Sequence, residues 1–282
     1  MKTYPKWLSA AVLSAMLASP AAALETKAKN VILMDYDTGE YLFAENAFVP
    51  VAPASMSKLM TVYVLFSKLK DGTLSLEDVF SVSENAWRTG GAASGSSTMF
   101  LPIGSKVTVE NLIKGIIIQS GNDACIVAAE NIAGSEEDFA ELMNAKAKEL
   151  GLKNSHFVNS TGLPHPDHRM SAEDLARLAQ ALIRDFPEYY SVFSQKSFTY
   201  NNILQGNRNP LLYSMPDADG LKTGHTAEAG FCLTASVKRG DRRLIGVMTG
   251  LKSNKERSEE AEKLMNWGFR EFNNYKVFKQ FQ

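Results

Sequence analysis

The sequence has little of what disulfide-rich, metal-binding or nucleic-acid-binding proteins depend on. Among its 282 residues are two cysteines and four histidines, and the formal net charge is −1. So few cysteines exclude a disulfide scaffold, and a charge near zero argues against nucleic acid as a partner. No apolar run reaches the ~20 residues that a membrane-spanning helix needs. A content of 45% hydrophobic residues can still form a sizeable globular core.

The first 23 residues have the pattern of an export signal. Lys2 and Lys6 form a positive n-region, residues 10–18 are an apolar h-region, and residues 21–23 are three alanines that suit a signal peptidase. We therefore predict a signal peptide at 1–23 and a mature chain near Leu24, in the periplasm or on the outer face of the cytoplasmic membrane. A retained membrane anchor is the alternative, and the apolar run is short for it.

The two cysteines, Cys125 and Cys232, each lie in an apolar stretch. Export would permit a disulfide, but the apolar surroundings favour two buried free thiols. A catalytic cysteine would need a positioned histidine, and the sequence singles none out.

Hydrophobic periodicity predicts strands, then helices, then strands and a closing helix. A hairpin is expected over 30–47 and a helix that is apolar nearly all round over 56–69. Further helices are expected at 109–118, 123–133, 136–150 and 171–183, strands at 197–200, 220–223, 230–237 and 244–248, and an amphipathic helix at 256–272. This order predicts an α+β fold: an antiparallel sheet flanked by helices, with an inserted helical lobe.

Three short motifs carry the chemistry: S-M-S-K at Ser55–Lys58, S-G-N at Ser120–Asn122 and K-T-G at Lys222–Gly224. Each is common by itself. Together they are informative, because one falls at a helix start, one at a break between helices and one on a strand that precedes a hairpin.

Ser55 and Lys58 are three residues apart, so their side chains share one helical face. A lysine beside a serine hydroxyl can take its proton and make it a nucleophile. For this the lysine must be neutral, and we expect burial and the nearby charge of Lys222 to lower its pKa.

Ser120 is expected on the turn between two helices, where its hydroxyl can pass a proton to the leaving amine. Asn122 offers a carbonyl and an amide to hold a substrate peptide bond. The alternative is that both residues only cap the helix that follows.

Lys222 and Thr223 on an edge strand can bind a carboxylate, and Gly224 would let a substrate backbone pair with that strand. The backbone N–H groups of Ser55 and His225 are candidates for an oxyanion hole. The imidazole of His225 is either a modulator of Lys222 or a plain surface side chain.

The three motifs in this order resemble the signature of penicillin-binding proteins and serine β-lactamases. The longer strings IIIQSGNDACIVAAENIAG, ELGLKNSHF, DADGLKTGHT and AEKLMNWGFREF are similar specifically to low-molecular-mass D-alanyl-D-alanine carboxypeptidases, over about residues 30–272. The resemblance implies a β-lactamase/transpeptidase-like fold and a serine-type carboxypeptidase that trims peptidoglycan stem peptides ending in D-Ala-D-Ala. It also implies inhibition by β-lactams and no cofactor or metal.

Carried over residue by residue, the resemblance makes Ser55 the acylated nucleophile, Lys58 its base, and Ser120 and Asn122 the second motif. Lys222, Thr223 and Gly224 match the third motif, and Arg257 matches an arginine that helps bind the terminal carboxylate. We expect the peptidase domain at 24–275 and a tail at 276–282. Many relatives continue with a β-rich domain and an amphipathic membrane helix; the tail would be the start of such a domain, and membrane attachment stays open.

Several other activities fit parts of this pattern. A β-lactamase would need a carboxylate for deacylation in the loop after the second motif, and no glutamate lies between Glu149 and Glu173. A DD-endopeptidase that cuts cross-links shares all three motifs and is the main alternative; a low-turnover penicillin- or peptidoglycan-binding protein is another. A zinc site at His165, Asp167 and His168 is disfavoured, because these residues lie in a proline-rich loop without an HExxH helix.

Overall fold

The computed structural model describes residues 24–274. The predicted signal peptide and the predicted tail lie outside the described residues.

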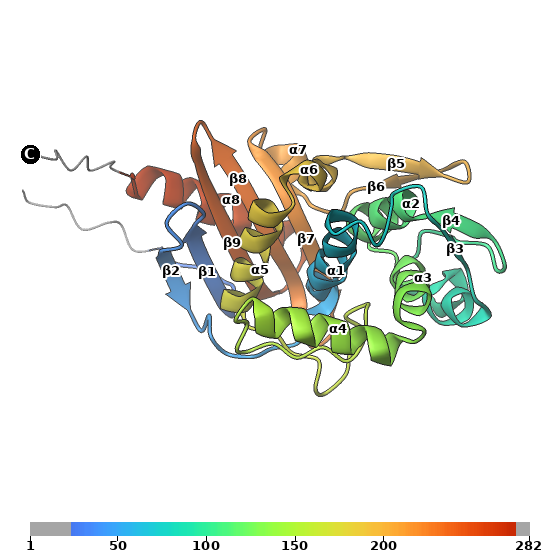
Figure 1. Ribbon diagram of the computed structural model, residues 1–282. Coiled ribbons are helices and arrows are strands. Elements are labelled where there is room, and N and C mark those ends of the chain that lie inside the picture. The colour runs from blue at the N-terminus through green and yellow to red at the C-terminus, as the bar shows by residue number, and fades with distance from the viewer. Residues whose placement is uncertain (1–23, 275–282) are drawn as a thin grey trace, which may run out of the picture.

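A five-stranded antiparallel sheet with the strand order β2-β1-β9-β8-β7 forms the centre of the fold (Figure 1). Its strands are β1 (Asn30–Asp35), β2 (Tyr41–Glu45), β7 (Ala218–Thr226), β8 (Gly230–Arg239) and β9 (Arg242–Leu251). The first and last parts of the chain therefore share one sheet, since β1 pairs with β9. β7 is an edge strand, as the motif analysis expected, but it is longer than the predicted 220–223.

Both faces of the sheet are buried, each against different helices. In β1, Val31 and Leu33 belong to the cluster that packs against α8 (Asn254–Glu271), whereas Ile32 and Met34 belong to the core of the helical lobe. This alternation follows from the period of two residues along a strand. In Figure 1, α8 lies behind the sheet, and α5 and α1 lie in front of it.

The helical part is built around α1 (Lys58–Lys70), which is buried on all sides from Lys58 to Phe66, as predicted. Around it lie α2 (Val109–Lys114), α3 (Asn122–Ala133), α4 (Glu136–Glu149), α5 (Ala172–Asp185) and α6 (Pro187–Tyr190), whereas the short α7 (Leu211–Ser214) packs against β7 and α8. Ser135 and Ser171 cap α4 and α5 through their hydroxyls, which accept from the N–H groups of Asp138 and Asp174. The predicted α+β fold with an inserted helical lobe is thus confirmed.

The sequence analysis missed the short elements. The exception is β5 (Ser197–Tyr200), which was predicted with these bounds. Its partner β6 (Ile203–Gly206) and the hairpin of β3 (Val79–Ser81) with β4 (Lys106–Thr108) were missed, and their strands have three or four residues. Strands this short show no clear alternation, so periodicity detects them poorly. Also missed were η1 (Ala54–Ser57), η2 (Ala86–Gly90), η3 (Ala92–Ser94) and η5 (Ser191–Ser194).

The predicted break near Ser120 exists and begins earlier than expected. After α2 the backbone widens into η4 (Gly115–Gln119), a π-helical turn, and Ser120 then adopts φ 65° and ψ 31°. This left-handed residue ends one helix and lets α3 begin two residues later. No helix within residues 24–274 is long and apolar enough to cross a membrane.

Candidate active site

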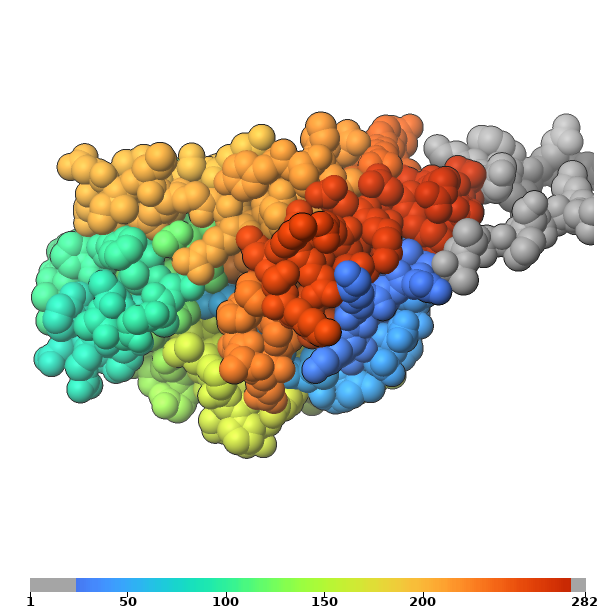
Figure 2. Space-filling view, turned by 180° about the vertical axis from the view of Figure 1, so that it is seen from behind, coloured from blue at the N-terminus to red at the C-terminus, as the bar shows by residue number. Residues whose placement is uncertain are grey.

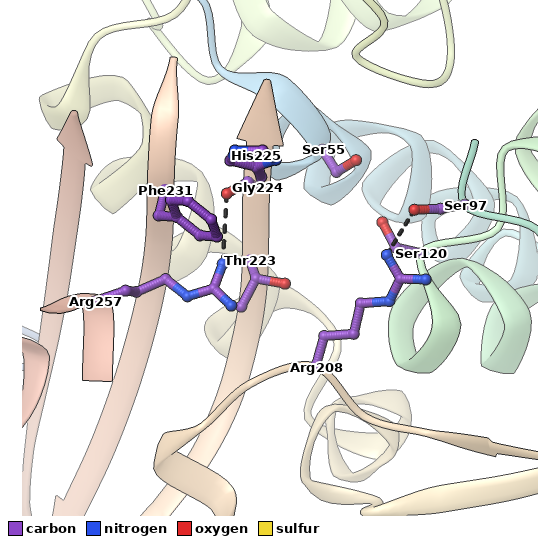
Figure 3. Close-up of a pocket in the computed structure, with 9 residues that line it drawn as sticks. All are labelled: Ser55, Ser97, Ser120, Arg208, Thr223, Gly224, His225, Phe231 and Arg257. Atoms are coloured by element: carbon purple, nitrogen blue, oxygen red, sulfur yellow. Dashed lines mark hydrogen bonds between the residues drawn. The ribbon is translucent and has the colours of Figure 1, made fainter. Parts of the chain in front are cut away.

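The three motifs meet at one cavity of about 290 Å³ between the edge strand β7 and the helical lobe. Figure 3 shows Ser55 and Ser120 on the lobe side of it and Thr223, Gly224 and His225 along β7, with Arg257 beside the strand. Lys58, Asn122 and Lys222 lie behind this wall and are almost completely buried. The structure therefore brings together all nine residues that the motifs and the resemblance selected.

Ser55 lies on η1, at the start of the predicted helix, but the α-helix itself begins at Lys58 and not at residue 56. η1 is a 3₁₀ turn that leads directly into α1, and Lys58 is the first residue of α1. In a 3₁₀ turn, residues three apart are stacked along the axis. Lys58 Nζ accordingly lies 3.1 Å from Ser55 Oγ.

Lys58 Nζ has two further partners, both of which can only accept. One is Asn122 Oδ1 at 2.7 Å, and the other is the carbonyl oxygen of Thr161, in the loop between α4 and α5. A neutral amine has two N–H donors and one lone pair. With both donors used, its lone pair is left for the hydroxyl proton of Ser55.

Burial lowers the pKa of Lys58, because a charged amine loses its hydration in the interior. Repulsion by Lys222 was expected to be a cause as well. Repulsion between the two lysines is mutual, and burial and then the charge of Lys58 lower the pKa of Lys222 well below its usual range.

Ser120 links the second and third motifs. Its hydroxyl accepts a hydrogen bond from Lys222 Nζ at 2.9 Å, and Lys222 also donates to the carbonyl oxygen of Thr223 at 3.2 Å. The N-cap residue of α3 is Gly121, so Ser120 is not the cap of this helix, and its hydroxyl is bonded to Lys222.

Asn122 is held from both sides. Its Nδ2 donates to Ser96 Oγ at 2.9 Å, while its backbone N–H donates to the carbonyl oxygen of Ser97 at 2.7 Å. Its amide is thereby oriented with Oδ1 toward Lys58.

Gly224 has a packing role in addition to the role in substrate pairing that the sequence suggested. A Cβ at this position would lie 3.0 Å from the carbonyl oxygen of Pro53 and 3.1 Å from Cβ of Ala54. The missing side chain therefore lets β7 approach the Ser55 turn, which brings the nucleophile and the strand together.

His225 is exposed at the end of β7. Its ring packs against Phe231 with centroids 4.0 Å apart. The hydrogen bonds of Lys222 go to Ser120 and Thr223, not to this imidazole.

Arg257 lies in the first turn of α8 and its guanidinium enters the cavity, as the resemblance implied. Its Nη1 donates to the carbonyl oxygens of Gly224 at 3.4 Å and Cys232 at 3.3 Å, and its Nη2 donates to Asn254. Its buried Nε has no hydrogen-bond partner. Burial lowers the pKa of Arg257 to about 10, so the guanidinium is still positively charged at neutral pH. Within residues 24–274 it forms no ion pair with a carboxylate.

The sequence analysis missed Ser97, Arg208 and Phe231. Arg208 Nη1 donates to Ser97 Oγ at 2.6 Å across the mouth of the cavity (Figure 3). Neither residue belongs to a motif or a periodic segment. One usable indication was the pair of asparagines around Arg208, since Asn207 and Asn209 fix this turn through hydrogen bonds to Phe193 and Gly220.

The cysteines and the remaining histidines lie outside the cavity wall. Cys125 and Cys232 are buried and free, which confirms that prediction. His168 is buried, its Nδ1 accepts from the N–H of Val158, and burial lowers its pKa to about 4. Across residues 24–274, three or more histidine, cysteine or acidic side chains nowhere gather in a way that could hold a metal ion.

Known proteins are similar to this one in both fold and sequence. The crystal structure of penicillin-binding protein 5 from Haemophilus influenzae matches with a TM-score of 0.85 and 41% identity, covering 88% of this chain and 72% of that one. The D-alanyl-D-alanine carboxypeptidase DacC of Escherichia coli is 50% identical over 243 residues, or 86% of this chain and 61% of DacC. DacA of the same organism is 46% identical over 259 residues, 90% of this chain and 64% of DacA.

The fold is therefore that of the penicillin-binding proteins. The family profile of the D-alanyl-D-alanine carboxypeptidases, peptidase family S11, matches residues 16–253. The chain belongs to this family. It spans less than two thirds of the length of DacC and DacA.

Proposed function

We propose that the protein is an exported serine-type D-alanyl-D-alanine carboxypeptidase, which removes the terminal D-alanine from peptidoglycan stem peptides and is acylated by β-lactams. One observation carries the proposal. The buried amine of Lys58 lies within hydrogen-bond reach of Ser55 Oγ, and its other two partners are acceptors.

In the first step, Lys58 takes the proton of Ser55 and Oγ attacks the carbonyl carbon between the last two residues. The backbone N–H groups of Ser55 and His225 stabilise the oxyanion that forms. The C–N bond then breaks, and the departing D-alanine amine needs a proton. Ser120 can deliver it, because its hydroxyl is bonded to Lys222, which can replace the lost proton.

Recognition of the substrate depends on the edge strand and on the arginines. The peptide would add to β7 as a further strand, while the Asn122 side chain contacts its backbone. The terminal carboxylate would lie against Thr223 and Arg257, whose partnerless Nε marks an unused donor. A carboxylate at this position would supply the missing counter-charge.

In a second step, water attacks the acyl-serine and regenerates the free enzyme. The loop between α4 and α5 offers one carboxylate, Asp167, whose side chain is 73% exposed and lies 3.9 Å from a nitrogen of His165. No acid of this loop is buried at the nucleophile to activate water. This supports slow release of penicillin, and thus a carboxypeptidase rather than a β-lactamase.

Mass spectrometry after incubation with a labelled penicillin tests the proposal. We expect a long-lived adduct on Ser55, release of D-alanine from a peptide ending in D-Ala-D-Ala, and loss of both in Ser55→Ala. An adduct on another residue, or rapid catalytic clearance of penicillin, would contradict it. Cleavage of cross-linked dimers without release of terminal D-alanine would favour a DD-endopeptidase. No observation on the described residues favours that activity.

A further inference from the structure

The carbonyl oxygen of Thr161 that accepts from Lys58 belongs to a short buried turn. This turn is part of the loop between α4 and α5, and Figure 2 shows the yellow-green outer part of that loop at the surface beside the orange hairpin of β7 and β8. Its inner residues Ser160 and Thr161 are buried instead, with 0% and 1% of their surface exposed. Because an irregular segment has no regular ladder of backbone hydrogen bonds, other groups must hold the carbonyl in place.

Ser160 is held through three of its polar atoms. Its N–H and its hydroxyl both donate to Glu136 Oε1, at 3.1 and 2.5 Å, and Glu136 is the first residue of α4. Its carbonyl oxygen accepts from Thr61 Oγ1 at 2.7 Å, one turn after Lys58 on α1. Thr161 follows directly, so the orientation of its carbonyl group depends on Glu136 and Thr61.

The same turn lies directly against the segment that carries Ser55. Gly162 has φ 77°, and a Cβ at this position would lie 2.1 Å from the carbonyl oxygen of Ala54 and 2.5 Å from Ser57 Oγ. The backbone therefore approaches η1 as closely as only a glycine allows. A shift of the turn would displace both the base and the nucleophile.

Glu136 also places a negative charge near the buried amine of Lys58. The titratable groups around this amine come from three other elements and one loop: Cys125 and Asp123 on α3, Glu136 on α4, Lys222 on β7 and Arg208 after β6. Burial raises the pKa of Cys125 to about 12, so Cys125 is an uncharged thiol. Burial is the largest cause of the lowered pKa of Lys58, Arg208 lowers this pKa further, and Glu136 raises it.

The base needs this negative charge when it takes the proton. Lys58 must be neutral beforehand, but it then becomes an ammonium in a completely buried position, which is costly without compensation. The carboxylate of Asp123 already accepts four hydrogen bonds from Thr98 and from backbone N–H groups. Glu136 is connected to the amine through Ser160 and the carbonyl of Thr161.

We propose that Glu136 is a positioning residue of the acylation step: it holds the Thr161 carbonyl against Lys58 through Ser160, and its charge stabilises the ammonium that forms. Glu136 is not among the residues that line the cavity, so it acts on the reaction through other groups. This role rests on the proposed function, in which Lys58 is the base.

Two variants separate the charge of Glu136 from its hydrogen bonds. Glu136→Gln keeps an oxygen that can accept from Ser160 and removes the charge, whereas Glu136→Asp keeps the charge and is one methylene too short. We measure the second-order rate at which a labelled penicillin acylates Ser55, across pH.

For Glu136→Gln, the midpoint of the rise with pH should move down by about 0.5–1 pH unit, because losing a nearby carboxylate lowers the pKa of Lys58. The plateau should fall about threefold to tenfold, since the amine is a weaker base. For Glu136→Asp, the midpoint should stay and the plateau should fall about tenfold, because the carbonyl of Thr161 is held less firmly.

Glu137→Gln is the matched control. Glu137 is the next residue, exposed in the same first turn of α4, so the change removes one charge at the same helix end. It should alter neither the midpoint nor the plateau, and circular dichroism melts check the folding of each variant. An unchanged midpoint in Glu136→Gln, or an equal shift in Glu137→Gln, would overturn the role of Glu136.

A titration of Lys58 itself keeps the test independent of acylation. Lysine labelled with ¹³C at Cε reports its protonation by NMR, and the signal of Lys58 is identified by its absence in Lys58→Arg. The titration midpoint should be lower in Glu136→Gln than in the wild type. If penicillin does not acylate the wild type, the proposed function fails and this titration still decides on Glu136. If acylation is normal but both variants titrate and react like the wild type, Glu136 has no such role while the proposed function stands.

Discussion

The two walls of the cleft are built differently. On the helical side, the side chains of Lys58 and Asn122 are buried and their polar atoms are all bonded to neighbouring groups. On the strand side, His225 is exposed, and Arg257 keeps a donor without a partner. The helical wall is thus complete before substrate arrives, whereas the strand wall is completed by the ligand. Chemistry and recognition are separated, and changes to the two walls should have different kinetic effects.

The largest effect is expected from Lys58→Arg on the helical wall. Arginine keeps the positive charge and cannot be deprotonated, so Ser55 loses its base. The second-order rate of penicillin acylation should fall by about 10²–10⁴. Rates measured across pH, with a circular dichroism melt as the control for folding, check this. If the folded variant acylates at a near-normal rate, Lys58 is not the base and another group takes the proton of Ser55.

The pH dependence of the wild type follows from the same lysine. Burial lowers the pKa of Lys58, so the neutral and active form is present above a lowered pKa and is lost as the pH falls. Acylation should rise with pH and level off well below ~10.4, the pKa of an exposed lysine. A plateau reached only near that value would show that the amine is not perturbed. The Arg variant should lack this rise.

The next effect concerns Asp123, which connects the helical wall to the loop at the mouth. Its carboxylate accepts from Thr98 Oγ1 at 2.6 Å and from the N–H groups of Met99, Leu101 and Ala124 at 2.9, 3.1 and 2.9 Å. Every partner of the carboxylate is a hydrogen-bond donor. An asparagine at this position would place its own NH₂ donor against one or more of these donors. Asp123→Asn should lower the free energy of unfolding by about 2–4 kcal/mol.

Urea unfolding measures this loss, and the same change at Asp71 is the control. Asp71 accepts from the N–H and hydroxyl of Thr73 at 2.9 and 2.6 Å, but on the exposed surface. Asp71→Asn should therefore cost well under about 1 kcal/mol. Equal losses for the two variants would mean that the buried carboxylate does not hold the loop.

The smallest effect belongs to the strand wall. Amidating the terminal carboxylate of the substrate removes a charge-assisted contact to Arg257, which should cost roughly 1.5–3 kcal/mol in kcat/KM, or one to two decades. Arg257→Gln should lose the same preference for the free acid. Shortening the peptide at its other end is the control and should cost less. Equal cleavage of amide and acid would place the carboxylate elsewhere.

The sequence predicted the chemical centre better than its surroundings. Ser55, Lys58, Ser120 and Lys222 could be predicted because side-chain spacing and helix breaks are local properties. Ser96, Ser97 and Arg208 could not, because their positions depend on tertiary contacts such as those of Asp123. The packing role of Gly224 could not be predicted for the same reason: only the fold shows that its α-carbon faces the segment before Ser55.

The left-handed backbone at Ser120 and at Ala54, with φ 65° and 50°, has a consequence for evolution. A non-glycine residue in this conformation costs about 1–2 kcal/mol, and both positions adjoin the groups that act on the substrate. A glycine would relieve the strain at either position, but at Ser120 it would also remove the hydroxyl. Selection for activity therefore opposes selection for thermal robustness at this position, and stabilising substitutions should be sought away from the catalytic turns.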